Sequence, residues 1–128
     1  MTELVGTVGP GQGLGVERMT RPVLDLIRSR TGIDAISGTL NVWLGRPVDE
    51  SLFPYFIDAA DISPDWVGET GQSGYWWVRI SIEGRFEGVA ARAVEPDYPD
   101  DLVEIVCGVH LRSTLDLKDG DTITMTVL

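Results

Sequence analysis

Two residues near the first third of the chain have side chains suited to binding a metal ion. Thr39 and Asn41 are separated by one residue in a segment, residues 39–44, whose composition predicts a strand. Side chains two residues apart on a strand point to the same face, with backbones about 7 Å apart. Two neutral oxygens so placed suit Mg²⁺, which takes few protein ligands and keeps water and phosphate oxygens for the rest. The alternative is that Thr39 is an ordinary strand residue and Asn41 binds a nearby backbone group.

A single carboxylate interrupts an apolar segment much later in the chain. Glu104 lies within residues 102–106, which predict a short strand, and alternation places it on one face with Leu102 and Val106. If that face is inward, Glu104 is a buried carboxylate that needs a partner or a raised pKa, and such a group is a candidate site residue. If the face is outward, Glu104 is a solvated charge at a sheet edge. Both interpretations stay open.

A series of alternating glycines near the N-terminus could let a ligand approach the main chain closely. It does not match the dinucleotide fingerprint, and it lacks the lysine of a P-loop. It is therefore either a flexible turn or a loop that cradles phosphate. The glycines concerned are Gly6, Gly9, Gly11, Gly13 and Gly15.

A small polar cluster near the C-terminus offers a second possible anion contact. Arg112 could present a two-pronged donor to phosphate, and it lies beside His110, the only histidine of the chain. A single histidine excludes a multi-histidine metal site. The alternative for both residues is a helix start packed over the end of a barrel.

Composition excludes several classes of function. The 128 residues carry a net charge of −10 with one lysine, Lys118, which argues against nonspecific nucleic-acid binding. The one cysteine, Cys107, excludes an internal disulfide and fits a buried strand residue. No segment has the apolar length that spans a bilayer, and the N-terminus does not resemble a signal peptide. We expect a cytoplasmic monomer that binds neither membrane nor nucleic acid.

The elements that must position these residues are mostly short strands. We expect strands over residues 4–8, 39–44, 75–82, 86–93, 102–106 and 122–127, with loops and short strands over 49–74. One main helix is expected over residues 22–30, with Thr20 as its cap and Gly32 at its end. A single helical turn is expected over residues 111–115. Many short strands with frequent turns and one main helix predict a small β-barrel rather than a parallel α/β sheet.

The order and spacing of these segments resemble the archaeal CTP-dependent riboflavin kinase family. The resemblance rests on the glycine series, on residues 38–41 and on residues 103–121, and it covers nearly the whole chain. It implies that residues 1–128 form one compact six-stranded barrel of the cradle-loop type. It also implies a kinase that transfers the γ-phosphate of CTP to the 5′-hydroxyl of riboflavin, giving FMN and CDP.

The resemblance also implies a role for individual residues. Thr39 and Asn41 would ligate Mg²⁺, with Asn41 and Glu104 as catalytic residues. Glu104 would also contact the flavin, together with the position held by Pro96. The nucleotide would be contacted, largely through main-chain groups, by Pro10, Gly11, Gln12, Gly13, Leu14 and Gly15 and by Val109, His110, Leu111 and Arg112.

Three positions depart from the family pattern. Pro10 stands where a serine is usual, Leu14 stands where a glutamate is usual, and Pro96 stands where a threonine would contact the flavin. Two alternatives follow: a non-catalytic module that binds flavin or nucleotide, and a CTP-dependent kinase for another small alcohol. The aromatic cluster Tyr75, Trp76 and Trp77 could stack a flat ring, or could be core with one exposed face.

Overall fold

The computed structural model describes residues 2–10, 20–62 and 73–128 of the chain. The described residues form seven strands: β1 (Glu3–Gly9), β2 (Leu40–Trp43), β3 (Tyr55–Asp58), β4 (Gly74–Ile82), β5 (Phe86–Val94), β6 (Leu102–Cys107) and β7 (Thr122–Val127). The helices within the same residues are α2 (Arg21–Thr31), α3 (Ala59–Ile62), α5 (Leu111–Thr114) and the 3₁₀ turn η1 (Glu50–Leu52). Each predicted strand is present, with ends that agree with the prediction or differ from it by one residue.

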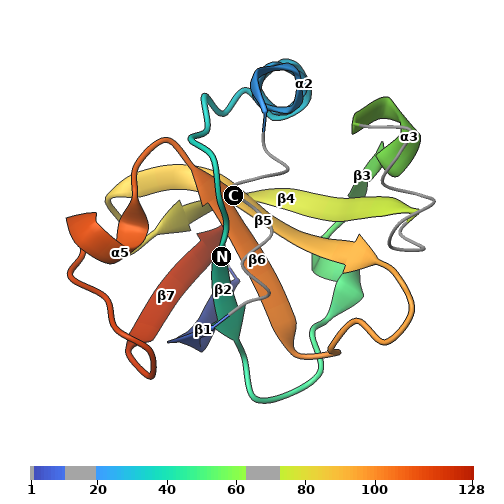
Figure 1. Cartoon of the computed structure of the whole chain (residues 1–128). Coiled ribbons are helices and arrows are strands. Elements are labelled where there is room, and N and C mark those ends of the chain that lie inside the picture. Colours follow the sequence, from blue (N-terminus) through green and yellow to red (C-terminus); the bar gives the residue numbers. More distant parts are fainter. Residues whose placement is uncertain (1, 11–19, 63–72) are drawn as a thin grey trace.

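The strands close into a barrel because β4 pairs with more than one neighbour at its two ends. The sheet order is β3-β4-β5-β6-β2-β1-β7, and an additional pairing of β7 with β4 closes the six strands from β4 to β7 into a ring. Residues 80–82 of β4 pair with β7, whereas residues 74–77 pair with β3. All pairings are antiparallel. The prediction of a mainly-β, six-stranded barrel is confirmed, with β3 as an extra strand alongside the splayed end of β4 (Figure 1).

Apolar side chains that alternate along the strands fill the barrel interior. On β6, for example, Val103 and Ile105 point inward, so Glu104 between them points to the outer face. Within this core the side chains with no exposed surface are Val42, Ile80, Ile82, Ala90, Val103, Ile123 and Met125. Cys107 is buried in the same core, as predicted, and burial raises the pKa of its thiol.

The outer face of β4, β5 and β6 is covered in part by α2. Val23 of this helix is buried with Trp77, Ala91 and Val106 in a second apolar cluster. Figure 1 shows α2 outside the barrel, above β4 and β5. Because α2 and this cluster cover part of the outer face, a polar side chain next to the cluster can be shielded from solvent without lying in the barrel core.

The ends of α2 agree with the prediction except in one detail. Pro22 lies in the first turn, and Gly32 ends the helix with φ 78°, a left-handed conformation that glycine adopts at low cost. The N–H of Gly32 donates to the carbonyl of Arg28 at 2.9 Å. Thr20 is the N-cap residue, but its side chain makes no capping hydrogen bond. The prediction of a Thr20 cap is therefore right in position and wrong in its hydrogen bond.

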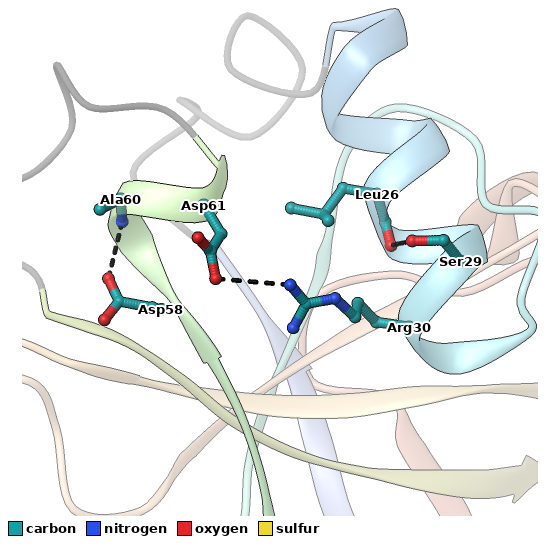
Figure 2. Close-up of polar contacts among 6 residues, drawn as sticks. All are labelled: Leu26, Ser29, Arg30, Asp58, Ala60 and Asp61. Atoms are coloured by element: carbon teal, nitrogen blue, oxygen red, sulfur yellow. Dashed lines mark hydrogen bonds and ion pairs between the residues drawn. The ribbon is translucent and has the colours of Figure 1, made fainter.

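A polar contact joins α2 to the short helix that follows β3. Arg30 Nη2 lies 3.4 Å from Asp61 Oδ2, and Asp58 Oδ1 accepts a hydrogen bond from the N–H of Ala60 at 2.9 Å (Figure 2). Both partners of the ion pair are about half exposed, so the pair adds little stability. It nevertheless shows that α2 and α3 are neighbours on the outer face. Among the described residues, no helix has both the length and the apolar character that crossing a membrane requires.

Candidate functional site

The two chemically promising segments of the sequence are neighbouring strands in the structure. Asn41 on β2 is the register partner of Glu104 on β6, and on its other side it is the partner of Gly9 on β1. These three residues therefore form one row across the outer face of the barrel. The row continues on β5, where Ala91 is the partner of Glu104. Antiparallel pairing thus brings together residues that are more than sixty positions apart.

Glu104 is a largely buried carboxylate with two hydrogen-bond partners. Tyr98 Oη donates to Glu104 Oε2 at 2.8 Å, and Thr39 Oγ1 donates to Oε1 at 3.4 Å. Burial raises the pKa of Glu104 above its ordinary value, and the nearby Glu95 acts in the same direction. The two hydrogen bonds oppose this shift because they favour the charged form. Neither of the two interpretations left open by the sequence holds in full: Glu104 faces outward from the barrel, yet it is largely buried and hydrogen-bonded rather than a solvated charge.

Asn41 has an amide oxygen that is buried and unpaired. Its Oδ1 has no hydrogen-bond partner among the described residues. A buried polar atom without a partner costs about 1–3 kcal/mol, so such an atom calls for a bound group that completes it. The alternative in which Asn41 satisfies a backbone group is wrong for this oxygen. The outward-facing Thr39 lies nearby through its contact with Glu104.

The donor set around Asn41 fits a hard cation that keeps most of its water. An amide oxygen and a hydroxyl oxygen next to a carboxylate are oxygen ligands of the kind Mg²⁺ prefers. No group of three or more His, Cys, Asp and Glu side chains that could hold a metal occurs within residues 2–10, 20–62 and 73–128. Thr39 and Asn41 are thus residues that could hold a hard cation together with oxygens from water or a ligand.

The C-terminal segment reaches the same row through the end of β1. Arg112 Nη2 donates to the carbonyl of Gly9 at 3.2 Å and pairs with Asp119 Oδ1 at 2.7 Å. The N–H of Gly120 donates to the carbonyl of Val8 at 2.7 Å. Pro10, which follows β1, is exposed. The structure thus places residues 112–120 beside the start of the glycine series, whose residues 11–15 lie outside the described part of the chain.

The side chains of residues 109–111 have mainly structural contacts. Leu111 is buried in the barrel core, and Val109 packs against that core. His110 caps α5, since its Nδ1 accepts a hydrogen bond from the N–H of Ser113 at 3.3 Å. A helix start packed over the barrel end is therefore what these side chains form. Any nucleotide contact from Val109 and Leu111 would have to use the main chain, as the family resemblance implies.

The loop between β5 and β6 contributes a residue that the sequence reasoning missed. Pro96 is exposed, whereas Tyr98, two residues later, reaches Glu104 with its hydroxyl. Burial, followed by the charge of Glu104, raises the pKa of Tyr98, so this hydroxyl is a donor at neutral pH. The signal in the sequence that could have pointed to this residue is a tyrosine within a loop of prolines and aspartates. The sequence alone gives no reason to direct that side chain at Glu104.

A cavity of about 290 Å³ is lined in part by Tyr98. Its walls include Trp76, Arg92 and Tyr98, and two carboxylates, Glu50 and Glu95, also line it. Trp76 is 43% exposed, whereas Trp77 is buried against α2. The aromatic cluster of β4 is thus core with one exposed side chain, and that exposed ring faces the cavity.

Trp43 packs against Gly9, at the β1 end of the row. An added Cβ at Gly9 would lie 2.6 Å from Trp43 Cδ1, so the indole ring rests directly on the Gly9 backbone. A side chain at position 9 would displace this ring, which explains the glycine there. Trp66 lies outside the described residues.

Comparisons with known proteins agree with this arrangement of segments. The model of the CTP-dep_RFKase family, described as "Domain of unknown function DUF120", matches residues 8–127. A protein named riboflavin kinase from Methanothermobacter thermautotrophicus is 30% identical over 118 residues, covering 91% of this chain and 92% of that protein. Riboflavin kinases of Pyrobaculum arsenaticum and Methanocella arvoryzae are 32% and 33% identical, over 98% and 77% of this chain.

The longer relatives extend beyond the matched region. The chain spans 60% of the Pyrobaculum protein and 44% of the Methanocella protein. The family match nevertheless includes Asn41, Glu104 and Arg112, the residues that meet at the described row. From the extent of that match and from its relatives, the chain belongs to the CTP-dependent riboflavin kinase family.

Proposed function

We propose that this protein phosphorylates riboflavin at its 5′-hydroxyl and uses CTP as the phosphate donor. The observation that carries the proposal is the row on the outer face, in which the unpaired oxygen of Asn41 lies beside the buried carboxylate of Glu104. A metal-binding oxygen next to an acceptor-orienting carboxylate is the pair that phosphoryl transfer to an alcohol requires. The family name and the named relatives support riboflavin and CTP as the substrates.

Thr39 and Asn41 would hold Mg²⁺ beside Glu104 in the row. Bound there, the ion would neutralise charge on the phosphate oxygens of the donor. The protein contributes two neutral oxygens and a buried setting, which leaves coordination positions for phosphate and water. This division of labour suits a chain of net charge −10, whose single lysine cannot supply the positive charge that a triphosphate needs.

Glu104 would orient the acceptor hydroxyl. The oxygen of the riboflavin 5′-hydroxyl attacks the γ-phosphorus of CTP and forms the new P–O bond. The bond between that phosphorus and the β,γ-bridging oxygen breaks, CDP leaves, and the hydroxyl proton is released. A fixed carboxylate beside the reacting hydroxyl lowers the barrier chiefly by holding it in line with the phosphorus. Glu104 is suited to this because its two oxygens are held by Tyr98 and Thr39.

The nucleotide would bind between the glycine series and α5. Residues 10–15 and 109–112 would contact it mainly through backbone groups, with Arg112 as the cationic side chain. Support comes from the contact between Arg112 and Gly9, which ties α5 to the end of β1. Pro10 and Leu14 replace polar residues usual in the family, so in this chain backbone N–H groups carry more of the binding.

A second candidate is a CTP-dependent kinase for a different small alcohol. Pro96 favours it, because this exposed residue cannot offer the hydroxyl expected to contact the flavin. The third possibility, a binding module without turnover, shares that observation. The two kinases would share a site for CTP and differ in the acceptor, whereas the binding module would hold flavin or nucleotide without transferring phosphate.

The test is FMN formation followed by chromatography. Purified protein is incubated with riboflavin, Mg²⁺ and either CTP or ATP, and Asn41→Ala and Glu104→Gln are run beside it. We expect FMN to form with CTP and little to form with ATP. In both variants the rate of FMN formation should fall by roughly a hundredfold or more, the range expected when a positioning group is removed. A folded protein that yields no FMN but phosphorylates another alcohol would favour the second candidate. Binding without any transfer would favour the third.

A further inference from the structure

The loop between β5 and β6 contacts Glu104, the largely buried carboxylate of the site, through a side chain. Its one aromatic residue, Tyr98, donates to Glu104 Oε2 at 2.8 Å, and the contact is partly buried. The other carboxylate oxygen accepts from Thr39 at 3.4 Å, which is near the limit for a hydrogen bond. Tyr98 is therefore the stronger of the two described side-chain contacts that fix the direction of this carboxylate.

Tyr98 is itself held in place by a buried arginine from β5. The guanidinium carbon of Arg92 lies 5.2 Å from the centre of the Tyr98 ring, a cation–π distance. Arg92 is 8% exposed and donates to the carbonyls of Leu102 and Pro99, at 2.6 and 3.2 Å. These two carbonyls follow Tyr98 closely in the chain. Arg92 thus pins both the ring and the end of the loop that carries it.

The weaker contacts of Arg92 do not account for its burial. Glu50, its acidic neighbour, lies 3.8 Å away and is 79% exposed, so that pair contributes little. A buried guanidinium is costly unless its donors are satisfied, and here loop carbonyls satisfy them. Arg92 therefore holds residues 98–102 in place through hydrogen bonds to loop carbonyls rather than through an ion pair.

We infer that Tyr98 is a positioning residue that fixes Glu104 for the acceptor alcohol, and that Arg92 holds Tyr98 in place. This inference rests on the proposed kinase function. It assigns to Tyr98 a role at the end of the site where Pro96 offers no hydroxyl. The tyrosine acts through Glu104 and is not expected to touch the phosphate donor. Its removal should therefore affect use of the acceptor and leave use of CTP unchanged.

The test compares Tyr98→Phe, Glu104→Gln and the double variant with wild-type protein. Tyr55→Phe is the matched control, because Tyr55 is 54% exposed on the edge strand β3. Steady-state FMN formation is measured while riboflavin and CTP are varied separately. We expect Tyr98→Phe to lower kcat/KM for riboflavin by about tenfold to a hundredfold, since small displacements of a positioned group have effects of this size. The KM for CTP should stay within about twofold of wild type.

The double variant separates positioning from direct contact with the acceptor. If Tyr98 acts only through Glu104, Tyr98→Phe should cause no further loss in the Glu104→Gln background. Losses that multiply would overturn the inference and place Tyr98 on the substrate itself. A Tyr98→Phe protein as active as Tyr55→Phe would also overturn it, and so would one that fails to fold, because the role is orientation rather than stability. Wild-type protein that binds CTP but forms no FMN would instead overturn the proposed function on which the inference rests.

Discussion

Replacing Asn41 by leucine should make the protein more stable and inactive at once. Asn41 is the only asparagine of the chain, and its buried Oδ1 has no partner among the described residues. Leucine has a similar shape and no polar atoms, so it removes the unsatisfied oxygen without opening a cavity. If Asn41 is a metal ligand, its unpaired oxygen is a stability cost that is recovered only when the ion binds.

The size of the effect follows from that oxygen. Relief of one buried unsatisfied polar atom is worth about 1–3 kcal/mol, so Asn41→Leu should raise the free energy of unfolding by roughly 1 kcal/mol or more without Mg²⁺. For a chain of this length, each kcal/mol moves Tm by about 4 °C. A ligand at one hundred times its Kd stabilises the wild type by about 2.7 kcal/mol, and this gain should be absent in the variant.

The assay is urea denaturation of both proteins with and without Mg²⁺ and CTP. Thr126→Val serves as the control, because it makes a polar-to-apolar change on β7 at a residue that pairs with Glu3 and Ser81, away from the site. The control should keep the full stabilisation by Mg²⁺ and CTP. The reasoning is refuted if Asn41→Leu is less stable than wild type without ligand, or if Mg²⁺ and CTP still stabilise it fully.

Two further outcomes are expected. Arg112→Ala should raise the KM for CTP by about tenfold, measured by steady-state kinetics. It should lower the free energy of unfolding, measured by denaturation, by only about 0.2–1 kcal/mol, because the ion pair of Arg112 with Asp119 is exposed. An unchanged KM for CTP would show that Arg112 is not part of the nucleotide site. Cys107 should react with a thiol reagent at pH 8 far more slowly in the native than in the urea-unfolded protein. The reason is that burial raises the pKa of its thiol and blocks access of the reagent. Equal reaction rates in the two states would contradict the place of Cys107 in the core.

The strands were predictable because their side chains alternate in a way that the barrel requires. In β7, Ile123 and Met125 are buried while Thr122, Thr124 and Thr126, which alternate with them, face outward, as the sequence pattern indicates. The double pairing of β4 was not predictable, since nothing in residues 74–82 specifies which strand lies alongside each half. Partner choice depends on closure of the whole sheet, which local patterns do not encode.

The candidate site was predictable in part for a similar reason. Alternation groups Glu104 with Leu102 and Val106, and Asn41 with Thr39, on one face of each strand without saying which face is outward, and the family resemblance suggests that Glu104 and Asn41 belong together. That Glu104 is buried depends on Tyr98 and on the cluster under α2, which are contacts between segments far apart or in irregular loops. Arg92 was missed because it lies among alanines in a strand, and only the structure shows that loop carbonyls satisfy it.

The most direct test follows the phosphoryl group itself. Protein is incubated with riboflavin, Mg²⁺ and CTP carrying a radioactive γ-phosphate, and the labelled products are separated. The account predicts that the label appears in FMN in equal amount to the CDP formed, and that Glu104→Gln slows this transfer by roughly a hundredfold or more. Label released as free phosphate, or label that stays in CTP while the folded protein binds both substrates, would contradict it.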